Sequence, residues 1–347
     1  MLTKKQRTEI KEHLHSAQNP LFFFDNDADG LCSFLLLQRY IERGKGFPIR
    51  SFPSLTREYF RKVKELNADY IFILDKPSVS KDFFDEARQI NIPIVWIDHH
   101  ATDLKEIPDF VHYYNPFFNK FKTTEPVTDI CYKITGKKDD LWIAVAGCIA
   151  DSFVPDFYLN FKKKCPDLSL DSKNAFDIFY KSEIGKIARI FNFALKDKTT
   201  NVINMLKYLM KIKTPYEVLE ENSKNYAMHH RFNEINKKMQ KLIEKARQVK
   251  INHEKLLFFQ YGGSLSISSD LSNELSYIFP EKIIVVVYIT GIKANISARG
   301  EGVKKIILNA IKELKDATGG GHENAVGAKV KIEDLEKFRE NLIKSIE

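Results

Sequence analysis

Three aspartates at every second position, followed by a glycine, are the residues of this sequence with the clearest potential for chemistry. They lie in the stretch FFFDNDADG as Asp25, Asp27, Asp29 and Gly30. The same spacing begins an EF-hand calcium loop, which closes with a bidentate glutamate at its twelfth position. That position is Leu36 here. We therefore do not expect a calcium-storage loop.

The elements that position this triplet are a buried strand before it and a helix after it. Short apolar runs of this kind recur along the first part of the chain and alternate with helical patterns. Strands that alternate with helices predict right-handed βαβ units and a parallel sheet. The apolar runs occupy residues 21–24, 70–74 and 92–97, and the helical patterns occupy 31–43 and 81–89.

Each of the three expected strands ends in an aspartate. Asp25, Asp75 and Asp98 follow the three runs in order, and His99 and His100 come directly after the last one. The carboxyl ends of parallel strands lie at one edge of the sheet, where ligands of such folds bind. Neighbouring strands are about 5 Å apart. We therefore expect these side chains to converge.

Carboxylates crowded at one edge repel one another and have raised pKa values unless cations neutralise them. A single aspartate at a strand end more often caps a helix or a turn, but three strand ends of this kind favour a metal site. Oxygen ligands with one or two imidazoles favour Mn²⁺ or Mg²⁺ over zinc. Two ions about 3.5–4 Å apart can activate a water and hold both oxygens of a phosphoryl transfer.

The composition is that of a globular protein with a basic surface. The chain has 347 residues, 44% of them hydrophobic and 12% aromatic, which predicts two domains. Its formal net charge of +8 favours anionic partners such as nucleic acid.

The cysteines and the polar N-terminal segment favour a cytoplasmic location. The four cysteines form no CxxC pair, so reduced and buried thiols are expected rather than zinc ligands or disulfides. The N-terminal segment is not a signal peptide, and no apolar run approaches the roughly 20 residues that span a membrane. The cysteines are Cys32, Cys131, Cys148 and Cys165.

The predicted organisation is a catalytic domain at 1–212, a helical connector at 213–252 and a smaller α/β domain at 253–347. The connector is rich in Lys and Arg and carries an apolar stripe with heptad spacing. One interpretation is a helix that packs on its own domains, and the other is a coiled coil that dimerises the chain or docks a partner. The stripe consists of Met228, Phe232, Ile235, Met239, Leu242, Ala246 and Val249.

The smaller domain combines apolar runs, helical patterns and a glycine run. Helices are expected from about Ser269, at 302–315 and at the end of the chain. The glycine run TGGGHENAVGAKV begins at residue 318. Three glycines in a row let a backbone approach a phosphate closely and point N–H groups at it, although an ordinary turn has the same composition. The expected strands are 255–261, 282–289 and 293–299.

Taken in order, these motifs resemble the DHH phosphoesterase family. DNDADG matches its first motif, Asp75 its second, the DHH sequence at 98–100 its third, and Asp151 in AVAGCIADS its fourth. GGGHENAVG at 319–327, with ISARG at 296–300 before it, resembles the DHH-associated domain. The family includes RecJ single-strand exonucleases, nanoRNases, cyclic-dinucleotide phosphodiesterases and family II pyrophosphatases. The stand-alone RecJ-like nuclease and nanoRNase branch is the most similar.

The resemblance implies roles for residues of both domains. One manganese ion would be held by Asp27, a second by Asp29, His99 and Asp151, and Asp75 would bridge the two. Asp98 would orient a histidine and His100 would face the substrate. Mg²⁺ is the alternative metal. In the smaller domain the substrate-binding residues would be Ser297, Arg299, Gly319, Gly320, Gly321 and His322.

Two positions depart from the family pattern. Many members carry a histidine ligand four residues before the middle aspartate, where this chain has Phe23, so Asp25 must supply the missing ligand. Lys76 and Pro77 follow Asp75, where small residues are common. These departures leave a non-catalytic nucleic-acid-binding scaffold as a third hypothesis.

The substrate prediction favours an exonuclease acting on single-stranded DNA or RNA in repair or RNA turnover. The positive charge, the basic connector helix and the lysines of NKFK at 119–122 suit a long phosphate backbone. Phe117, Phe118 and Phe121 could stack bases, although aromatic clusters are more often core. The absence of an added nucleic-acid domain within this sequence favours the alternative, a hydrolase of very short oligonucleotides or cyclic dinucleotides.

Overall fold

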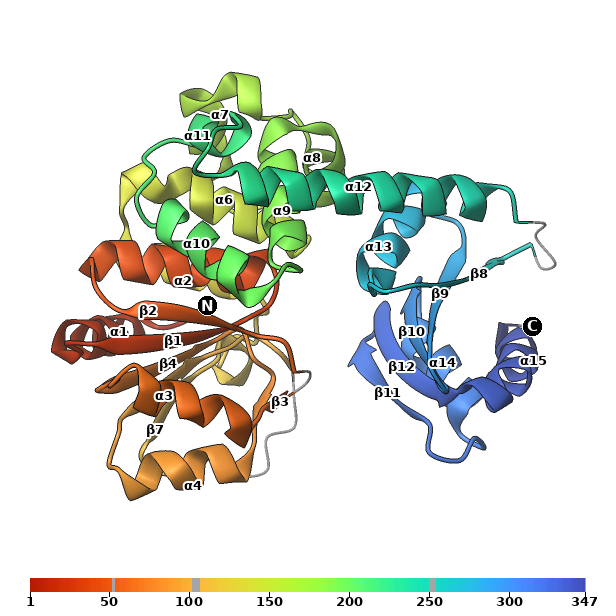
Figure 1. Ribbon diagram of the computed structural model, residues 1–347, viewed down its shortest axis with the longest axis horizontal. Helices are drawn as coiled ribbons and strands as arrows, with labels where there is room; N and C mark the ends of the chain where they lie inside the picture. The colour runs from red at the N-terminus through yellow and green to blue at the C-terminus, as the bar shows by residue number, and fades with distance from the viewer. Residues whose placement is uncertain (52–53, 102–106, 250–253, 347) are drawn as a thin grey trace. The chain divides into compact units, whose positions relative to one another are not determined.

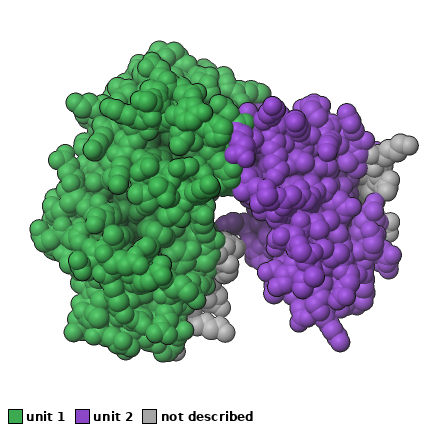
Figure 2. Space-filling view, in the orientation of Figure 1, with its two compact units in different colours: residues 1–233 green, residues 234–347 purple. Residues whose placement is uncertain are grey.

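The computed structural model describes residues 1–51, 54–101, 107–249 and 254–346. The chain forms two compact units, Met1–Asn233 and Glu234–Glu347, coloured separately in Figure 2. The predicted boundary between the connector and the second domain, at 252–253, lies outside the described residues. Within these residues no helix is both long and apolar enough to cross a membrane.

Unit 1 contains a five-stranded sheet in the order β2-β1-β4-β6-β7, and every neighbouring pair is parallel (Figure 1). The predicted parallel α/β fold is confirmed. A separate parallel pair, β3 and β5, lies outside this sheet. The strands are β1 (Pro20–Asp25), β2 (Lys45–Ile49), β3 (Ser54–Leu55), β4 (Tyr70–Leu74), β5 (Ser78–Val79), β6 (Ile94–Ile97) and β7 (Val111–Tyr114).

The alternating side chains of β1 explain why both faces of the sheet are covered. Phe24 stacks on Phe34 of helix α2, with ring centroids 5.2 Å apart. Phe23 points to the other face and meets Phe83 of helix α4 edge-on at 5.7 Å. A strand with large apolar residues on both faces must be central. The helices nearest the sheet are α1 (Lys4–Ser16), α2 (Ala28–Ile41), α3 (Arg61–Glu65), which follows the 3-10 turn η1 (Arg57–Phe60), and α4 (Lys81–Gln89).

The rest of unit 1 is helical and packs on α2. Helix α6 is apolar all round and almost wholly buried, as its sequence LWIAVAGCIA predicts, and it contacts α2, α5 and α9. The helices are α5 (Val127–Thr135), α6 (Leu141–Ala150), α7 (Tyr158–Lys164), α8 (Ala175–Lys181), α9 (Glu183–Ala194), α10 (Thr199–Leu209) and α11 (Tyr216–Leu219). The short 3-10 helices are η2 (Pro116–Phe118), η3 (Lys138–Asp140) and η4 (Pro166–Leu168). All four cysteines are buried free thiols, as predicted.

Helix α12 (Tyr226–Arg247) carries the predicted apolar stripe, but with a different period. After Met239 the next buried residue is Ile243, whereas Leu242 is half-buried. The buried positions therefore advance by about 3.6 residues per turn, the period of a straight helix, rather than the 3.5 of a coiled coil. Burial of the stripe within the chain supports the connector interpretation.

Unit 2 contains a five-stranded mixed sheet in the order β11-β12-β10-β9-β8, in which β8 and β9 are parallel and the other pairs antiparallel. Helices α14 and α15 cover one face and build its core, and α13 contacts β9 and β10. The strands are β8 (Leu256–Gly262), β9 (Ile283–Thr290), β10 (Lys293–Arg299), β11 (Thr318–His322) and β12 (Ala325–Lys331), and the helices are α13 (Ser268–Ile278), α14 (Val303–Ile311), η5 (Ile332–Asp334) and α15 (Leu335–Ile346).

The glycine run forms a hairpin of β11 and β12 that the sequence did not predict. Glycine has no side chain to pack on a pleated surface and disfavours strands. Pairing with β10 overrides this local preference, because β12 lies along the whole of β10 from Ala325 to Lys331. The glycines therefore lie in an exposed edge strand.

Candidate metal centre

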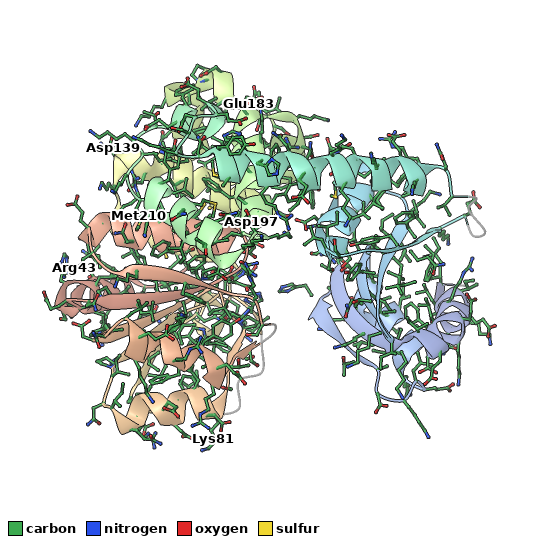
Figure 3. The ribbon with its side chains drawn as sticks, in the orientation of Figure 1. Arg43, Lys81, Asp139, Glu183, Asp197 and Met210 are labelled. Carbon is green, nitrogen blue, oxygen red and sulfur yellow. The ribbon has the colours of Figure 1, made fainter. Side chains whose placement is uncertain are left out.

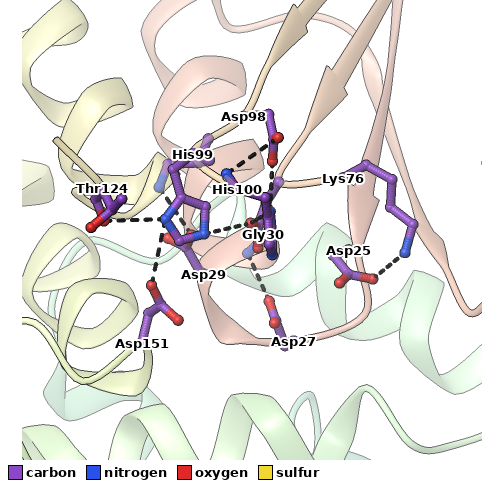
Figure 4. Close-up of polar contacts among 12 residues, drawn as sticks. Asp25, Asp27, Asp29, Gly30, Lys76, Asp98, His99, His100, Thr124 and Asp151 are labelled. Carbon is purple, nitrogen blue, oxygen red and sulfur yellow. Dashed lines mark hydrogen bonds and ion pairs between the residues drawn. The ribbon is translucent and has the colours of Figure 1, made fainter. Parts of the chain in front are cut away.

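The predicted aspartates and histidines meet at one edge of the unit 1 sheet (Figure 4). Asp25 is the last residue of β1, Asp75 follows β4, and Asp98 to His100 follow β6. Asp75 has a left-handed backbone, with φ of 57°, which is uncommon outside glycine and clusters at functional sites. Its N–H still donates to the Ile97 carbonyl at 3.0 Å, so the sheet holds this conformation in place.

His99 lies between two carboxylates. Its Nε2 is 3.3 Å from Asp75 Oδ1, and its Nδ1 is 3.9 Å from Asp151 Oδ2 and 3.3 Å from the Thr124 carbonyl. Burial by itself lowers the pKa of His99, but the close contact with Asp75 and the charge of Asp151 outweigh burial and raise that pKa well above its usual range. The surroundings of this imidazole therefore favour a cation.

The carboxylates themselves are held in an unfavourable environment. Burial, followed by the charges of Asp25 and Asp29, raises the pKa of Asp27 to about 8. Burial also raises the pKa of Asp75 well above its usual range, and that of Asp151 to about 6. Each raised pKa means that the ionised form is destabilised where it stands.

A divalent cation fits these residues. Oδ1 of Asp75 is buried and accepts no hydrogen bond of full geometry within the described part of the chain, and its near polar neighbours are the ring nitrogens of His99 and His100, at 3.3 and 3.9 Å. Three overlapping groups offer ligand atoms within 4.8 Å of one another. Oxygen-rich donors with imidazole suit Mn²⁺ or Mg²⁺. The groups are Asp75, His99 and His100; Asp29, His99 and Asp151; and Asp25, Asp27 and Asp75.

Asp98 and His100 form a hydrogen-bonded pair beside this centre. His100 Nδ1 donates to Asp98 Oδ1 at 2.7 Å. The other oxygen of Asp98 accepts from the Asn115 amide and the Tyr113 hydroxyl, both at 3.4 Å, and Asp98 is fully buried. A carboxylate with this many partners fixes the orientation and tautomer of the histidine that it contacts.

Asp29 lies in the metal centre and also forms hydrogen bonds to the beginning of helix α5. Its two oxygens accept from the backbone N–H groups of Val127 and Thr128, at 3.0 and 2.8 Å, at the beginning of α5. These two bonds connect Asp29 to the beginning of α5. Next to it, a Cβ on Gly30 would lie 2.4 Å from the Asp25 carbonyl oxygen, so only glycine lets α2 begin this close to β1.

Lys76 is the residue of the centre whose contact the sequence did not predict. Its ammonium group lies 2.8 Å from Asp25 Oδ1, and its side chain is only 1% exposed.

Phe23, which stands where many family members have a histidine ligand, is fully buried in the apolar cluster on the α3 and α4 face. Asn115 was missed as well. The signal that could have found it is a polar residue at the end of a fourth parallel strand, β7.

Four of the six predicted substrate residues of unit 2, Ser297, Arg299, Gly320 and His322, lie on alternate rungs of its sheet. Ser297 pairs with Gly327, which pairs with Gly320. Arg299 lies two residues after Ser297 on β10, and it is on the same rung as His322, which lies two residues after Gly320 on β11. Successive residues of a strand point to opposite faces, so these two rungs share one face. A Cβ on Gly320 or Gly327 would meet nothing within 4 Å, so the backbone there is open to a ligand.

Arg299 is held in place by helix α13. Its Nε donates to Asn273 Oδ1 at 2.5 Å, and its Nη2 donates to Ser269 Oγ at 3.0 Å. Ser297 donates to Ser268 Oγ at 3.0 Å. A guanidinium group fixed at the beginning of a helix is suited to an anionic ligand.

A cavity of about 920 Å³ lies in unit 1, away from the metal centre. It is lined by residues at the end of α2 and the beginning of α6, whereas Asp27 and Asp151 lie at the opposite ends of these helices. A helix the length of α2 separates its ends by roughly 20 Å. Asp139 and Met210, two of the lining residues, are labelled in Figure 3.

Protein-family models match a domain in each of the two units. Residues 21–150 match the N-terminal domain of the DHH family, and residues 253–347 match the DHHA1 domain. The chain belongs to the DHH family, whose members are metal-dependent phosphoesterases. No curated protein sequence matches the chain.

Solved structures share this fold at low sequence identity. A DHH domain described as a member of the s1p family of ribosomal proteins has a TM-score of 0.70 and 17% identity, over 99% of this chain and 89% of that chain. RecJ from Thermus thermophilus, in complex with Mn²⁺, has a TM-score of 0.64 and 14% identity. The match covers 97% of this chain but only 53% of RecJ, so this chain corresponds to about half of that protein.

Another similar structure has a substrate named in its description. The pGpG-specific phosphodiesterase PggH from Vibrio cholerae has a TM-score of 0.52 and 13% identity, over 95% of this chain and 99% of that chain. These identities show a common fold and leave the substrate of this chain to be argued from its own residues.

Proposed function

We propose that this chain is a Mn²⁺-dependent phosphodiesterase that removes nucleotides from an end of single-stranded DNA or RNA. The observation that carries the proposal is the convergence of Asp27, Asp75, His99 and Asp151, with raised carboxylate pKa values and a buried Asp75 oxygen that lacks a well-formed hydrogen bond. RecJ, which shares the fold, binds Mn²⁺. The sequence predicts two ions per centre, with Mg²⁺ as the alternative metal.

The reaction adds a water oxygen to phosphorus, breaks one P–O ester bond and delivers a proton to the leaving oxygen. A bound Mn²⁺ lowers the pKa of a water and neutralises phosphate charge. By the resemblance, Asp27 would hold one ion, Asp29, His99 and Asp151 would hold the second, and Asp75 would contribute to both. His100 has its Nδ1 bonded to Asp98, so Nε2 is the nitrogen that exchanges a proton with substrate.

The segment between β7 and α5 supports a single-stranded substrate. It is anchored beside the metal centre at both ends, by Asn115 on Asp98 and by the Thr124 carbonyl on His99. Between these anchors Phe118 and Phe121 are 54% and 76% exposed. Lys120 Nζ lies 5.8 Å from the Phe121 ring centroid. Exposed aromatic rings with lysines beside them are suited to stacked bases and backbone phosphates.

In unit 2, the exposed face of β11 and β12 beside Arg299 would bind a phosphate. Arg299 and His322 supply positive or hydrogen-bonding groups, and Gly320 and Gly327 leave the backbone accessible. The alternative, hydrolysis of very short oligonucleotides or cyclic dinucleotides, is favoured by the likeness to PggH over 99% of that shorter chain. Both substrate classes carry phosphates, so the length that is cleaved must be measured.

End-labelled 30-mers of DNA and RNA, together with dinucleotides and cyclic dinucleotides, incubated with Mn²⁺ test the proposal. We expect stepwise shortening of the 30-mers from one end. Exclusive cleavage of the short substrates would establish the alternative. Cleavage of no substrate, with salt-sensitive binding retained, would favour the scaffold hypothesis.

The variant Asp75→Asn tests the metal assignment. Asparagine tolerates the left-handed backbone at this position, so the fold should persist. We expect cleavage to fall by more than about 100-fold, because even residues behind metal ligands cost up to that factor. The matched control is Asp82→Asn on the exposed face of α4, which should leave the rate unchanged. Undiminished cleavage by Asp75→Asn would refute the assignment.

A further inference from the structure

We propose that the ammonium group of Lys76 occupies the place of one of the two divalent ions, so that the centre binds a single exchangeable metal ion. The proposal rests on the proposed metal-dependent function and changes the number of ions that it uses. It concerns the group formed by Asp25, Asp27 and Asp75, whose ligand atoms lie within 4.8 Å of one another.

The position of Lys76 is built into the fold. Its side chain is 1% exposed, and its Nζ lies 2.8 Å from Asp25 Oδ1 (Figure 4). The buried Trp96 ring donates from Nε1 to the Lys76 carbonyl at 2.9 Å, which fixes the backbone from the neighbouring strand. Pro77 follows and restricts the backbone further. A buried ammonium group needs a carboxylate beside it, so Lys76 cannot leave Asp25 without a large penalty.

The residues around the ammonium group supply carboxylates but no imidazole. Phe23, two residues before Asp25 on β1, points into the apolar cluster with Phe83 and Phe47 and offers no donor atom. Asp25, Asp27 and Asp75 are then three carboxylates without an imidazole, and one of them already has a positive partner. Lysine supplies a fixed charge and hydrogen-bond donors, and it has no acceptor with which to bind an ion.

The residues on the other side of Asp75 have the opposite character. His99 lies 3.3 Å from Asp75 and 3.9 Å from Asp151. The possible metal ligands on this side are therefore carboxylates and an imidazole. Asp75 and Asp151 both contact the His99 imidazole here, and neither contact involves an ammonium group. The exchangeable ion therefore belongs on this side, with Asp75 between the ion and the Lys76 ammonium group.

Counting bound ions tests the proposal without measuring activity. The full chain, stripped with a chelator and dialysed against excess MnCl₂, should retain one manganese per chain by elemental analysis and by titration calorimetry. Its electron paramagnetic resonance spectrum should be that of an isolated Mn²⁺ ion rather than an exchange-coupled pair. Two bound, coupled ions would overturn the proposal and leave the phosphodiesterase function standing. Absence of any bound ion would overturn both.

Substitutions at Phe23 and Lys76 test whether Lys76 limits the number of bound manganese ions. The double substitution Phe23→His with Lys76→Met removes the ammonium group, keeps an apolar chain of similar length, and adds an imidazole where the resemblance implies one. We expect it to bind a second manganese ion and to show the coupled spectrum. Lys81→Met is the control, because Lys81 is 85% exposed on α4 and should leave the count at one. A folded double variant that still binds one ion would contradict the substitution of Lys76 for metal.

Discussion

Units 1 and 2 each present a polar sheet edge, but the two edges differ in burial and in charge. At the edge of unit 1, Asp75 and Asp98 are 3% and 0% exposed and stand among further carboxylates. At the edge of unit 2, Gly320 and His322 are exposed, and the guanidinium group of Arg299 is on the same rung as His322. One edge is acidic and enclosed, and the other is open and weakly basic.

This difference determines what each edge can do. Enclosed carboxylates raise each other's pKa values and need cations, so the unit 1 edge holds a buried lysine and is suited to a metal ion. Exposed backbone keeps its hydrogen bonds with water when no ligand is present, so the unit 2 edge is stable without a ligand. We infer that metal removal disturbs unit 1 alone, and that unit 2 substitutions change substrate affinity alone.

The largest expected effect is stabilisation of unit 1 by Mn²⁺. An ion at about 100 times its dissociation constant should add ~2.7 kcal/mol to the free energy of unfolding. Hydrogen exchange with and without the ion should show slower exchange in α2 and α5 and no change in β10 and β12. Equally slowed exchange in both units would contradict the inference that the metal affects unit 1 alone.

The stability of the metal-free chain, and the gain in stability on adding Mn²⁺, should both depend on pH. The pKa of Asp27 is raised from 3.8 to about 8, so the folded metal-free chain binds a proton that the unfolded chain has lost. That contribution to stability is full below about pH 4 and disappears as pH rises toward about 8. Thermal unfolding without metal should therefore show lower stability at about pH 8 than at about pH 5. The gain on adding Mn²⁺ should be larger at the higher pH, because burial also raises the pKa values of Asp75 and Asp151, and a proton on either carboxylate competes with the ion.

A smaller effect is expected from Arg299→Gln in unit 2. Hydrogen bonds to charged groups contribute about 1.5–3 kcal/mol, so KM for a single-stranded substrate should rise about tenfold or more while kcat changes little. Steady-state kinetics at two salt concentrations would measure this, with Arg339→Gln on α15 as the control. A fall in kcat with unchanged KM would place Arg299 in the chemistry instead.

The smallest effect separates two adjacent glycines of β11. A Cβ on Gly319 would lie 2.8 Å from Ile311 Cδ1, whereas a Cβ on Gly320 would meet nothing within 4 Å. Gly320→Ala should therefore leave the free energy of unfolding unchanged or raise it by up to about 1 kcal/mol, because alanine restricts the unfolded chain, and Gly319→Ala should gain less, because the Ile311 side chain must move aside. Denaturant titration measures both. If Gly320→Ala nevertheless weakens substrate binding, the open face is the binding surface.

The sequence alone determined the elements whose signals are local. The apolar run at 70–74 and the helix at 81–89 were predicted with the bounds that the structure shows for β4 and α4. The aspartates at three strand ends follow from the same runs, because parallel strands must end at a common edge. The buried character of α6 also follows, since its residues are apolar on every side.

The tertiary structure decided what depends on residues far apart in the chain. Lys76 and Asp25 are 51 residues apart, and nothing near either residue indicates that the lysine is buried. Strand β11 has a glycine-rich sequence that disfavours strands, and only pairing with β12 makes it one. The intrinsic preference of a residue for helix or strand contributes a fraction of a kcal/mol. Burial and strand pairing involve many residues at once, so they prevail where they conflict with that preference.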